Sequence, residues 1–311
     1  MIRAVLYNSA IDVHYKIPKF GEQADFIGLN SVSFPAGKAI NFAKAVKILG
    51  EEVEVLGLVA SSDISKFRYF LDDCKIAHDL YEISGMTRIN TTIYEEESGM
   101  SYHLNSKNSP VLDEEISVFN EKLLEKIEEG DFLVFSGSVP DGYDDEIYRK
   151  LTERVKLKNV KVALDTRGNP LKYGLSALPF LVSPNEREFQ DLFGDEVKGL
   201  HNMILKGKRL IDSGVENVFI TLGKDGVVAL NKDECIRCVA PEITGPQINT
   251  VGCGDAFLAG AVVGFVRGFN FGEICRMATA CGAVNTLTRE ACKIELSKVG
   301  QVMEKIENER I

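Results

Sequence analysis

Short, continuously hydrophobic runs alternate with longer amphipathic segments through most of the chain. A strand exposed on one face would alternate apolar and polar residues, so these runs predict strands buried on both faces. The predicted strands are 4–7, 53–59, 132–135, 160–164, 180–182 and 218–221. Ile116, Phe119 and Leu123 recur on one face of a helix between two of them, with Leu124 and Ile127 beside them. This order predicts an α/β fold with a mainly parallel sheet and helices on both faces.

Two early segments break the alternation. Residues 13–35 show no helical period, and residues 87–104 alternate as a half-exposed strand would, with a turn at Ser98 and Gly99. Together they predict a small sheet, with strands from about 13–35 and 87–107, beside a single domain that spans residues 1–311. This sheet is either a lid over a ligand cleft or a dimer contact, and the two interpretations are compatible.

Charge and composition narrow the classes of function. The chain has 46 acidic and 36 basic residues, so a broad nucleic-acid-binding surface is not expected, although a local basic pocket for a phosphorylated small molecule is allowed. No apolar run approaches the roughly 18 residues of a membrane span, and no signal-peptide pattern opens the sequence, so we expect a cytoplasmic protein without membrane contact. Cys235 and Cys238 form a C-x-x-C pair without a second pair nearby, which does not predict a zinc site.

A glycine-rich turn before an apolar segment is the strongest chemical signal. Gly252, Cys253 and Gly254 precede a helix predicted over about 255–267, with Asp255 at its first position. Backbone N–H groups at a helix start, together with the helix dipole, form a site for anions. The alternative is that Asp255 simply caps a core helix.

The common nucleotide-binding motifs are absent from the sequence. It contains no G-x-x-x-x-G-K-[ST] P-loop, and Phe257 occupies the third glycine position of a G-x-G-x-x-G motif. The H-R-D and D-F-G sequences of protein kinases are missing too.

Two further loops follow predicted strands, at the edge where open α/β sheets bind ligands. Thr221, Gly223 and Gly226 lie in one loop, which fits either nucleotide contact or a hairpin turn. Asn185 and Glu188 lie in the other, where they would hold water on Mg²⁺ or would cap the next helix.

Polar and basic residues near the N-terminal side suit a sugar phosphate. Gly37, Lys38 and Asn41 stand at the start of a predicted helix, and Arg88 lies in the predicted small sheet, where it could bind a phosphate through two hydrogen bonds. The alternative for Lys38 and Arg88 is an ordinary solvated surface charge.

These motifs together resemble those of the PfkB (ribokinase-like) carbohydrate kinases. The segment 249–257 resembles their C-terminal signature, and 36–41 is similar to their Gly-Gly-Lys-Gly-x-Asn signature. Weaker matches follow in the family order at 8–12, 87–90, 136–140, 164–166, 184–188 and 221–226. Within the family, the matches at 8–12 and 87–90 are similar to the fructose-1-phosphate and tagatose-6-phosphate kinase branch.

The resemblance implies a ribokinase-like fold and a kinase that transfers the γ-phosphoryl group of ATP, with Mg²⁺, to a phosphorylated ketohexose. By the family pattern Asp255 is the base, and Gly252, Cys253 and Gly254 form the anion hole. The sugar and its phosphate would contact Asp12, Gly37, Lys38, Asn41, Arg88 and Ser138. The nucleotide and metal would contact Asn185, Glu188, Thr221, Gly223, Gly226 and Asn285, with Glu188 reaching Mg²⁺ through water. The family pattern also suggests a homodimer formed through the lid.

The sequence departs from the family pattern at several positions. Ala36 and Ala39 replace glycines, and their methyl groups could narrow the site or exclude a backbone conformation with positive φ. Ser9 replaces a proline, Cys253 replaces an alanine, and the Asn-Arg pair expected near residues 25–26 is missing. These departures bear on the substrate more than on phosphoryl transfer.

The leading prediction is therefore phosphorylation of fructose 1-phosphate to fructose 1,6-bisphosphate. Alternatives are a tagatose-6-phosphate kinase, a kinase of an unphosphorylated sugar or nucleoside, and a non-catalytic protein that binds a sugar phosphate. Lys38 and Arg88 argue against a neutral substrate, and the intact Gly-Cys-Gly-Asp turn argues against a non-catalytic role.

Overall fold

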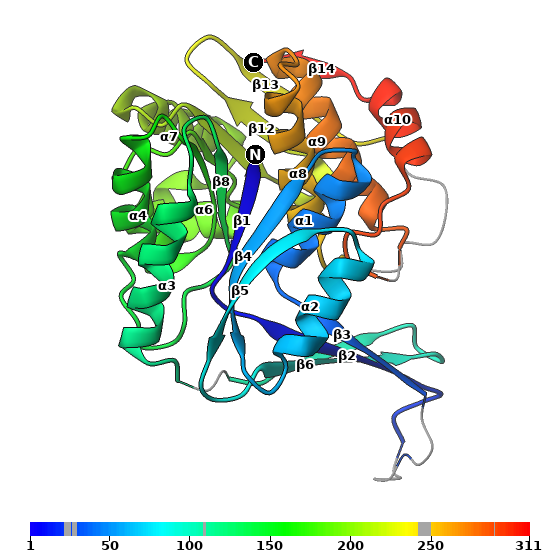
Figure 1. The fold of residues 1–311 in the computed structure, drawn as a ribbon. Helices are drawn as coiled ribbons and strands as arrows, with labels where there is room; N and C mark the ends of the chain where they lie inside the picture. Colours follow the sequence, from blue (N-terminus) through cyan, green and yellow to red (C-terminus); the bar gives the residue numbers. More distant parts are fainter. Residues whose placement is uncertain (22–25, 27–29, 108–109, 242–249, 289) are drawn as a thin grey trace.

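A large, mostly parallel sheet runs through the centre of the molecule (Figure 1). The computed structural model describes residues 1–21, 26, 30–107, 110–241, 250–288 and 290–311. Within them, the parallel part contains, in spatial order, β11 (Asn217–Thr221), β10 (Leu181–Val182), β9 (Lys161–Asp165), β8 (Phe132–Ser136), β1 (Ile2–Leu6), β4 (Val53–Ala60) and β5 (Ala77–Ile83). Every residue of β1, β4 and β8 is buried, as their continuous hydrophobic sequences predict. All six predicted strands are confirmed; β5 was not predicted.

Three antiparallel strands extend this sheet beyond β11. They are β12 (Val227–Leu230), β13 (Cys235–Cys238) and β14 (Asn308–Arg310). None of them was predicted, because each is short and they lie outside the strand–helix alternation.

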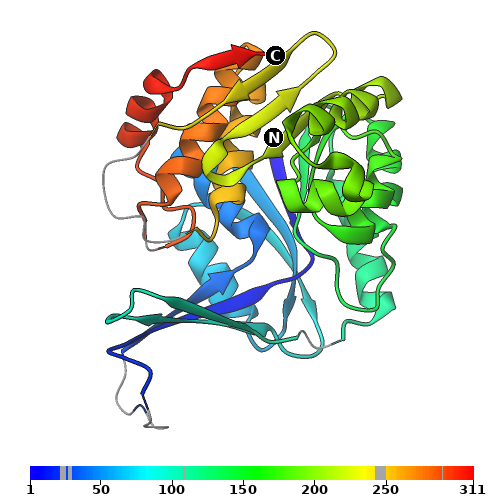
Figure 2. The same ribbon diagram turned by 180° about the vertical axis from the view of Figure 1, so that it is seen from behind.

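Helices cover both faces of the sheet (Figures 1 and 2). One face carries α1 (Lys38–Ile48), α2 (Ile64–Asp73), α8 (Cys253–Val266), α9 (Phe271–Asn285) and α10 (Leu296–Lys305). The other carries α3 (Asp113–Lys126), α4 (Ile147–Lys156), α5 (Gly168–Leu175), α6 (Glu186–Phe193) and α7 (Leu200–Ser213). Each layer buries its own hydrophobic cluster against the sheet. Among the described helices, none has the length and apolar character needed to cross a bilayer.

A second, smaller sheet lies at the end of the molecule toward which the parallel strands point (Figure 2). Its order is β3 (Ser31–Ala36), β2 (Ala10–Ile17), β6 (Arg88–Glu95) and β7 (Ser101–Asn105). The predicted small sheet is thus confirmed, and so is the β6–β7 turn around Ser98 and Gly99. β2 begins at Ala10, earlier than expected, and it pairs with β6 in parallel. Within the predicted segment 13–35, residues 22–25 and 27–29 lie outside the described part of the chain.

Candidate active site

The glycine turn leads into α8, which begins two residues earlier than the sequence predicted. α8 begins at Cys253, so Asp255 is its third residue and not its first, and the N-cap is Gly252. Gly252 has φ of 83°, and a Cβ built there would lie 2.8 Å from the Cβ of Ala291. Apart from its chain neighbours and its own helix backbone, no described residue lies within 4 Å of a Cβ built on Gly254. The turn therefore packs tightly on one side and has open space at Gly254, beside the free N–H groups of a helix start.

Asp255 is buried, with 4% of its surface exposed, and it does not cap the helix. Its Oδ2 accepts a hydrogen bond of 2.9 Å from Nδ2 of Asn41, at the far end of the sequence. Burial raises the pKa of Asp255 to about 6, although the charge of Lys38 and the bond from Asn41 act in the opposite direction. The carboxylate therefore ionises just below neutral pH, the range in which a general base is effective.

Lys38 is already paired, in contrast to the free phosphate ligand that the sequence suggested. Its Nζ lies 3.1 and 3.2 Å from the two carboxylate oxygens of Asp165, and Ser136 donates to Asp165 Oδ2 at 2.9 Å. Desolvation opposes the ammonium charge, but three neighbouring carboxylates, above all that of Asp165, outweigh it and raise the pKa of Lys38. Lys38 thus remains positively charged beside Asp255.

Sequence reasoning did not single out Asp165 as a site residue. It ends β9, whereas Lys38 starts α1, and their contact joins positions 127 residues apart. The available signal was an aspartate directly after a predicted buried strand, which places it at the ligand-binding edge of the sheet.

The small sheet brings Asp12, Asn90 and Arg88 to one face. Asp12 pairs with Asn90 in the β2–β6 register, and Asn90 Nδ2 donates to Asp12 Oδ1 at 2.8 Å. Arg88 lies two residues before Asn90 and therefore on the same face. Desolvation lowers the pKa of Arg88, while Asp12 acts in the opposite direction. Ser138 lies next to the connection into this sheet, because Asn8 Nδ2 donates to Ser138 Oγ at 2.7 Å.

Asn185 and Glu188 adopt the capping arrangement that the sequence left as the alternative. Asn185 Oδ1 accepts from the Glu188 N–H, and the Asn185 N–H donates to Glu188 Oε2, both at 2.9 Å. Burial raises the pKa of the Glu188 carboxyl, and Lys38 acts to lower it. Asn185 also forms a β-bridge to Thr221, so the two strand ends lie side by side.

The loop with Gly223 and Gly226 is a hairpin turn, which confirms that alternative. It joins β11 to the antiparallel β12 through the short 3₁₀ turn Gly223–Asp225. A Cβ on Gly226 would lie 1.8 Å from the carbonyl oxygen of Cys238, so only glycine fits there. A hairpin turn can still contact a nucleotide, so the nucleotide contact of Thr221, Gly223 and Gly226 stays a prediction.

Asn285 supports the glycine turn from behind and is fully buried. Its Nδ2 donates to the Val251 carbonyl at 2.9 Å, and its Oδ1 accepts from the Cys292 N–H at 2.7 Å. The amide thus has partners within the protein, and the nucleotide contact of Asn285 stays a prediction. Lys44 Nζ donates to the carbonyl of Ala291, the residue next to Cys292, at 2.9 Å and so stabilises the same segment.

Ala36 and Ala39, which replace family glycines, do not disturb the backbone. Ala36 ends β3 and Ala39 lies in α1, both are buried, and neither is among the described residues with positive φ. Their methyl groups pack inside the protein, and neither alanine requires the backbone conformation with positive φ that was expected to exclude it.

The carboxylates near the sheet edge fit the predicted Mg²⁺ only as outer contacts through water. In the described part of the chain, no three His, Cys, Asp or Glu side chains converge as a metal cage. Mg²⁺ keeps several waters and takes few protein carboxylates when it is bound to a nucleotide. Glu188, whose charge interacts with that of Asp165, matches an outer contact of this kind.

The family of the protein follows from its sequence similarity to known carbohydrate kinases. The sequence profile of the pfkB family carbohydrate kinases matches residues 3–297. The chain belongs to the pfkB family. It is accordingly a carbohydrate kinase, an activity that implies ATP as a substrate.

Characterised pfkB relatives are similar over most of the chain. The 1-phosphofructokinase of Borreliella burgdorferi is 29% identical over 296 residues, covering 95% of this chain and 94% of the relative. The D-tagatose-1-phosphate kinase of Bacillus licheniformis is 31% identical over 278 residues, covering 88% of each chain. Both relatives carry the names of sugar-phosphate kinases.

Solved structures of the pfkB family share the fold. Phosphofructokinase-2 from Escherichia coli, solved in complex with potassium, superposes with a TM-score of 0.90 at 23% identity, covering 98% of both chains. The ribokinase-like fold predicted from the sequence is therefore confirmed.

Proposed function

We propose that this protein phosphorylates fructose 1-phosphate to fructose 1,6-bisphosphate with ATP. The observation that carries the proposal is the buried Asp255 carboxylate, set between the open space at Gly254 and the charged Lys38. The 1-phosphofructokinase relative supports a ketohexose 1-phosphate as the acceptor.

In the proposed reaction Asp255 accepts the proton of the sugar 6-hydroxyl as the hydroxyl oxygen bonds to the γ-phosphorus. The bond from that phosphorus to the bridging oxygen of ATP breaks, and ADP leaves with the electron pair. N–H groups of the turn Gly252–Gly254 and the ammonium of Lys38 would stabilise the charge on the transferring group. Bound Mg²⁺ would neutralise charge between the phosphates of ATP.

Acceptor and donor would lie on two sides of Asp255. Asp12, Gly37, Asn41 and Ser138 would position the sugar from the side of the small sheet. Asn185, Glu188, Thr221, Gly223 and Gly226 would contact the nucleotide along the edge formed by β10 and β11.

The test is ADP release with MgATP against fructose 1-phosphate, fructose 6-phosphate, tagatose 1-phosphate, tagatose 6-phosphate, fructose, ribose and adenosine. We expect the highest kcat/KM on fructose 1-phosphate, and a fall of about 10³-fold or more in kcat for Asp255→Asn because the base is lost. Fructose 1-phosphate should still bind this variant in calorimetry. Binding of fructose 1-phosphate without turnover of any sugar by the unaltered protein would instead support the non-catalytic alternative.

Tagatose 1-phosphate is the second candidate acceptor, because the relative of that name is 31% identical to this chain. Higher kcat/KM on tagatose 1-phosphate than on fructose 1-phosphate would overturn the leading assignment and leave the chemistry at Asp255 intact.

A further inference from the structure

A pocket beside the small sheet contains an arginine that the sequence motifs did not single out. The pocket has a volume of about 340 Å³ and is lined by the loop 138–142, by the start of α5 at 167–170 and by Asp145. Arg167 lies on its wall at the N-cap position of α5. This volume falls in the range of small-ligand sites.

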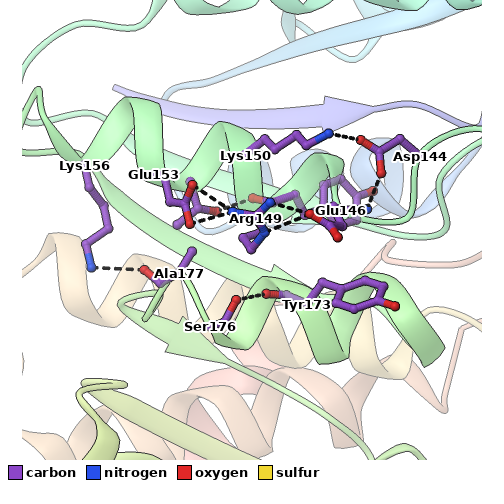
Figure 3. Close-up of polar contacts among 11 residues, drawn as sticks. Asp144, Glu146, Arg149, Lys150, Glu153, Lys156, Tyr173, Ser176 and Ala177 are labelled. Atoms are coloured by element: carbon purple, nitrogen blue, oxygen red, sulfur yellow. Dashed lines mark hydrogen bonds and ion pairs between the residues drawn. The ribbon is translucent and has the colours of Figure 1, made fainter.

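The wall opposite α5 is held in a fixed position by ion pairs. Lys150 pairs with Asp144 at 2.5 Å, Arg149 pairs with Glu146, and the Glu146 N–H donates to Asp144 Oδ1 at 2.9 Å (Figure 3). Asn169 Nδ2 then joins α5 to the loop before α4 by donating to Asp145 Oδ2 at 2.8 Å. The two walls of the pocket are therefore connected directly by a hydrogen bond.

Arg88 and Arg167 are close enough for their charges to interact. Arg88 begins β6 opposite Ala10, and the connection before Ala10 is bonded to Ser138, a residue of the pocket wall. Desolvation lowers the pKa of Arg88, and the charge of Arg167 lowers it further, whereas Asp141 acts in the opposite direction. Arg88 in the small sheet and Arg167 at the edge of the large one therefore influence each other electrostatically.

Neither guanidinium is fully paired within the described part of the chain. Nε of Arg88 is buried with no hydrogen-bond partner among the described residues. Arg167 is exposed, and within the described part of the chain its charge interacts with that of Glu188 without a direct ion pair or hydrogen bond. A buried donor without an acceptor costs free energy, and adjacent like charges repel. A phosphate between them would remove both costs. Asp141 and Asp145 also line the pocket, and the charges of Asp12 and Glu188 reach Arg88 and Arg167. A bound phosphate must therefore gain more from the two guanidinium groups than it loses to these carboxylates.

We propose that Arg167 is a second binding residue for the phosphate that the acceptor already carries, acting together with Arg88. The inference rests on the proposed function, because it names which group recognises the phosphorylated acceptor. Arg167 takes this role in place of Lys38, which pairs with Asp165 beside Asp255 and is assigned to the transferring group.

Arg167→Met tests this proposal, with Arg154→Met as the matched control. Arg154 lies on the outside of α4, pairs with Glu121 and, when substituted, changes the net charge by the same amount. For Arg167→Met we expect KM for fructose 1-phosphate to rise by about 10- to 100-fold, with kcat changed less than about threefold. Arg167→Lys should recover part of the loss. KM for unphosphorylated fructose should not change.

A second measurement separates this proposal from the proposed function. Inorganic phosphate should bind the unaltered protein in calorimetry and bind Arg167→Met about tenfold more weakly or worse, whatever sugar the enzyme uses. If phosphate affinity and KM change no more than in Arg154→Met, the proposal is wrong. A fall in kcat for phosphorylated and unphosphorylated acceptors alike would also overturn it, because Arg167 would then act on the transferring group.

Discussion

At the scale of single residues, the ionisation of Asp255 is set by burial and by two partners. Burial raises its pKa to about 6, while Lys38 and Asn41 stabilise the charged form. Because the base must be ionised, kcat/KM should be constant above this pKa and fall about tenfold per pH unit below it. A pH profile between 4.5 and 8.5 measures the midpoint.

Lys38→Met should move that midpoint. Removing a positive charge that favours the carboxylate raises the pKa of Asp255, so activity should be lost at a higher pH than in the unaltered enzyme. Lys47→Met is the control, because Lys47 lies on the same helix but pairs with the exposed Glu52. A midpoint that stays in place or moves to lower pH would show that Lys38 does not act on Asp255.

The site residues predicted from the sequence were mostly those that local motifs reveal. Gly252, Gly254 and Asp255 are neighbours in the chain, so their arrangement follows from a turn before a helix. The partners of Asp255 and Lys38 could not be predicted in this way, because the contacts join distant strand ends. For Asn185 and Glu188 the local sequence pattern was ambiguous, because it allowed a helix cap and a metal contact equally.

At the scale of elements, the turn before α8 combines a tightly packed glycine with an open one. Gly252→Ala places a Cβ against Ala291 at positive φ, so we expect a loss of about 1–3 kcal/mol in the free energy of unfolding. The methyl group of Gly254→Ala meets no described residue beyond its own helix within 4 Å, so the fold should be unaffected. Its kcat should nevertheless fall at least tenfold, because the methyl group would occupy the space assigned to the transferring phosphoryl group.

Thermal unfolding and steady-state kinetics on both variants check this pair. Full activity in Gly254→Ala would argue against an anion site at the turn, whatever happens to the stability of Gly252→Ala.

Strands with uniform burial were predictable, and those with mixed exposure were not. β1, β4 and β8 are hydrophobic throughout because helices cover both of their faces. β5 lies at the sheet edge, buries only Leu80 and Ile83, and also contains the charged residues Asp79 and Glu82, so its sequence shows neither a continuous hydrophobic run nor a regular alternation. Its sheet position follows from tertiary packing, which overrides local propensity.

At the scale of the whole molecule, the small sheet exposes an apolar face opposite Asp12 and Asn90. Ile89 and Leu104 lie on that face and are 49% and 56% exposed. Exposed apolar patches of this kind mark contacts between proteins, which supports the predicted homodimer through the lid.

Light scattering after gel filtration tests the dimer. We expect twice the chain mass of 34.3 kDa for the unaltered protein, and a shift to the monomer for the double variant Ile89→Lys, Leu104→Lys. Leu157→Lys is the control, because Leu157 is 90% exposed on the opposite layer of helices. A monomer at micromolar concentration in the unaltered protein would contradict the prediction.

The division of the proposed site between two sheets has an evolutionary consequence. Asp12 and Arg88 belong to the small sheet, whereas Asp255 and the glycine turn belong to the large domain. Substitutions in the small sheet could therefore change the preferred sugar while the phosphoryl-transfer residues stay the same. The fructose and tagatose 1-phosphate enzymes lie at nearly equal identity to this chain. Overall sequence identity is thus a poor guide to the preferred sugar. When related enzymes diverge in substrate, we expect the responsible substitutions to lie in the small sheet.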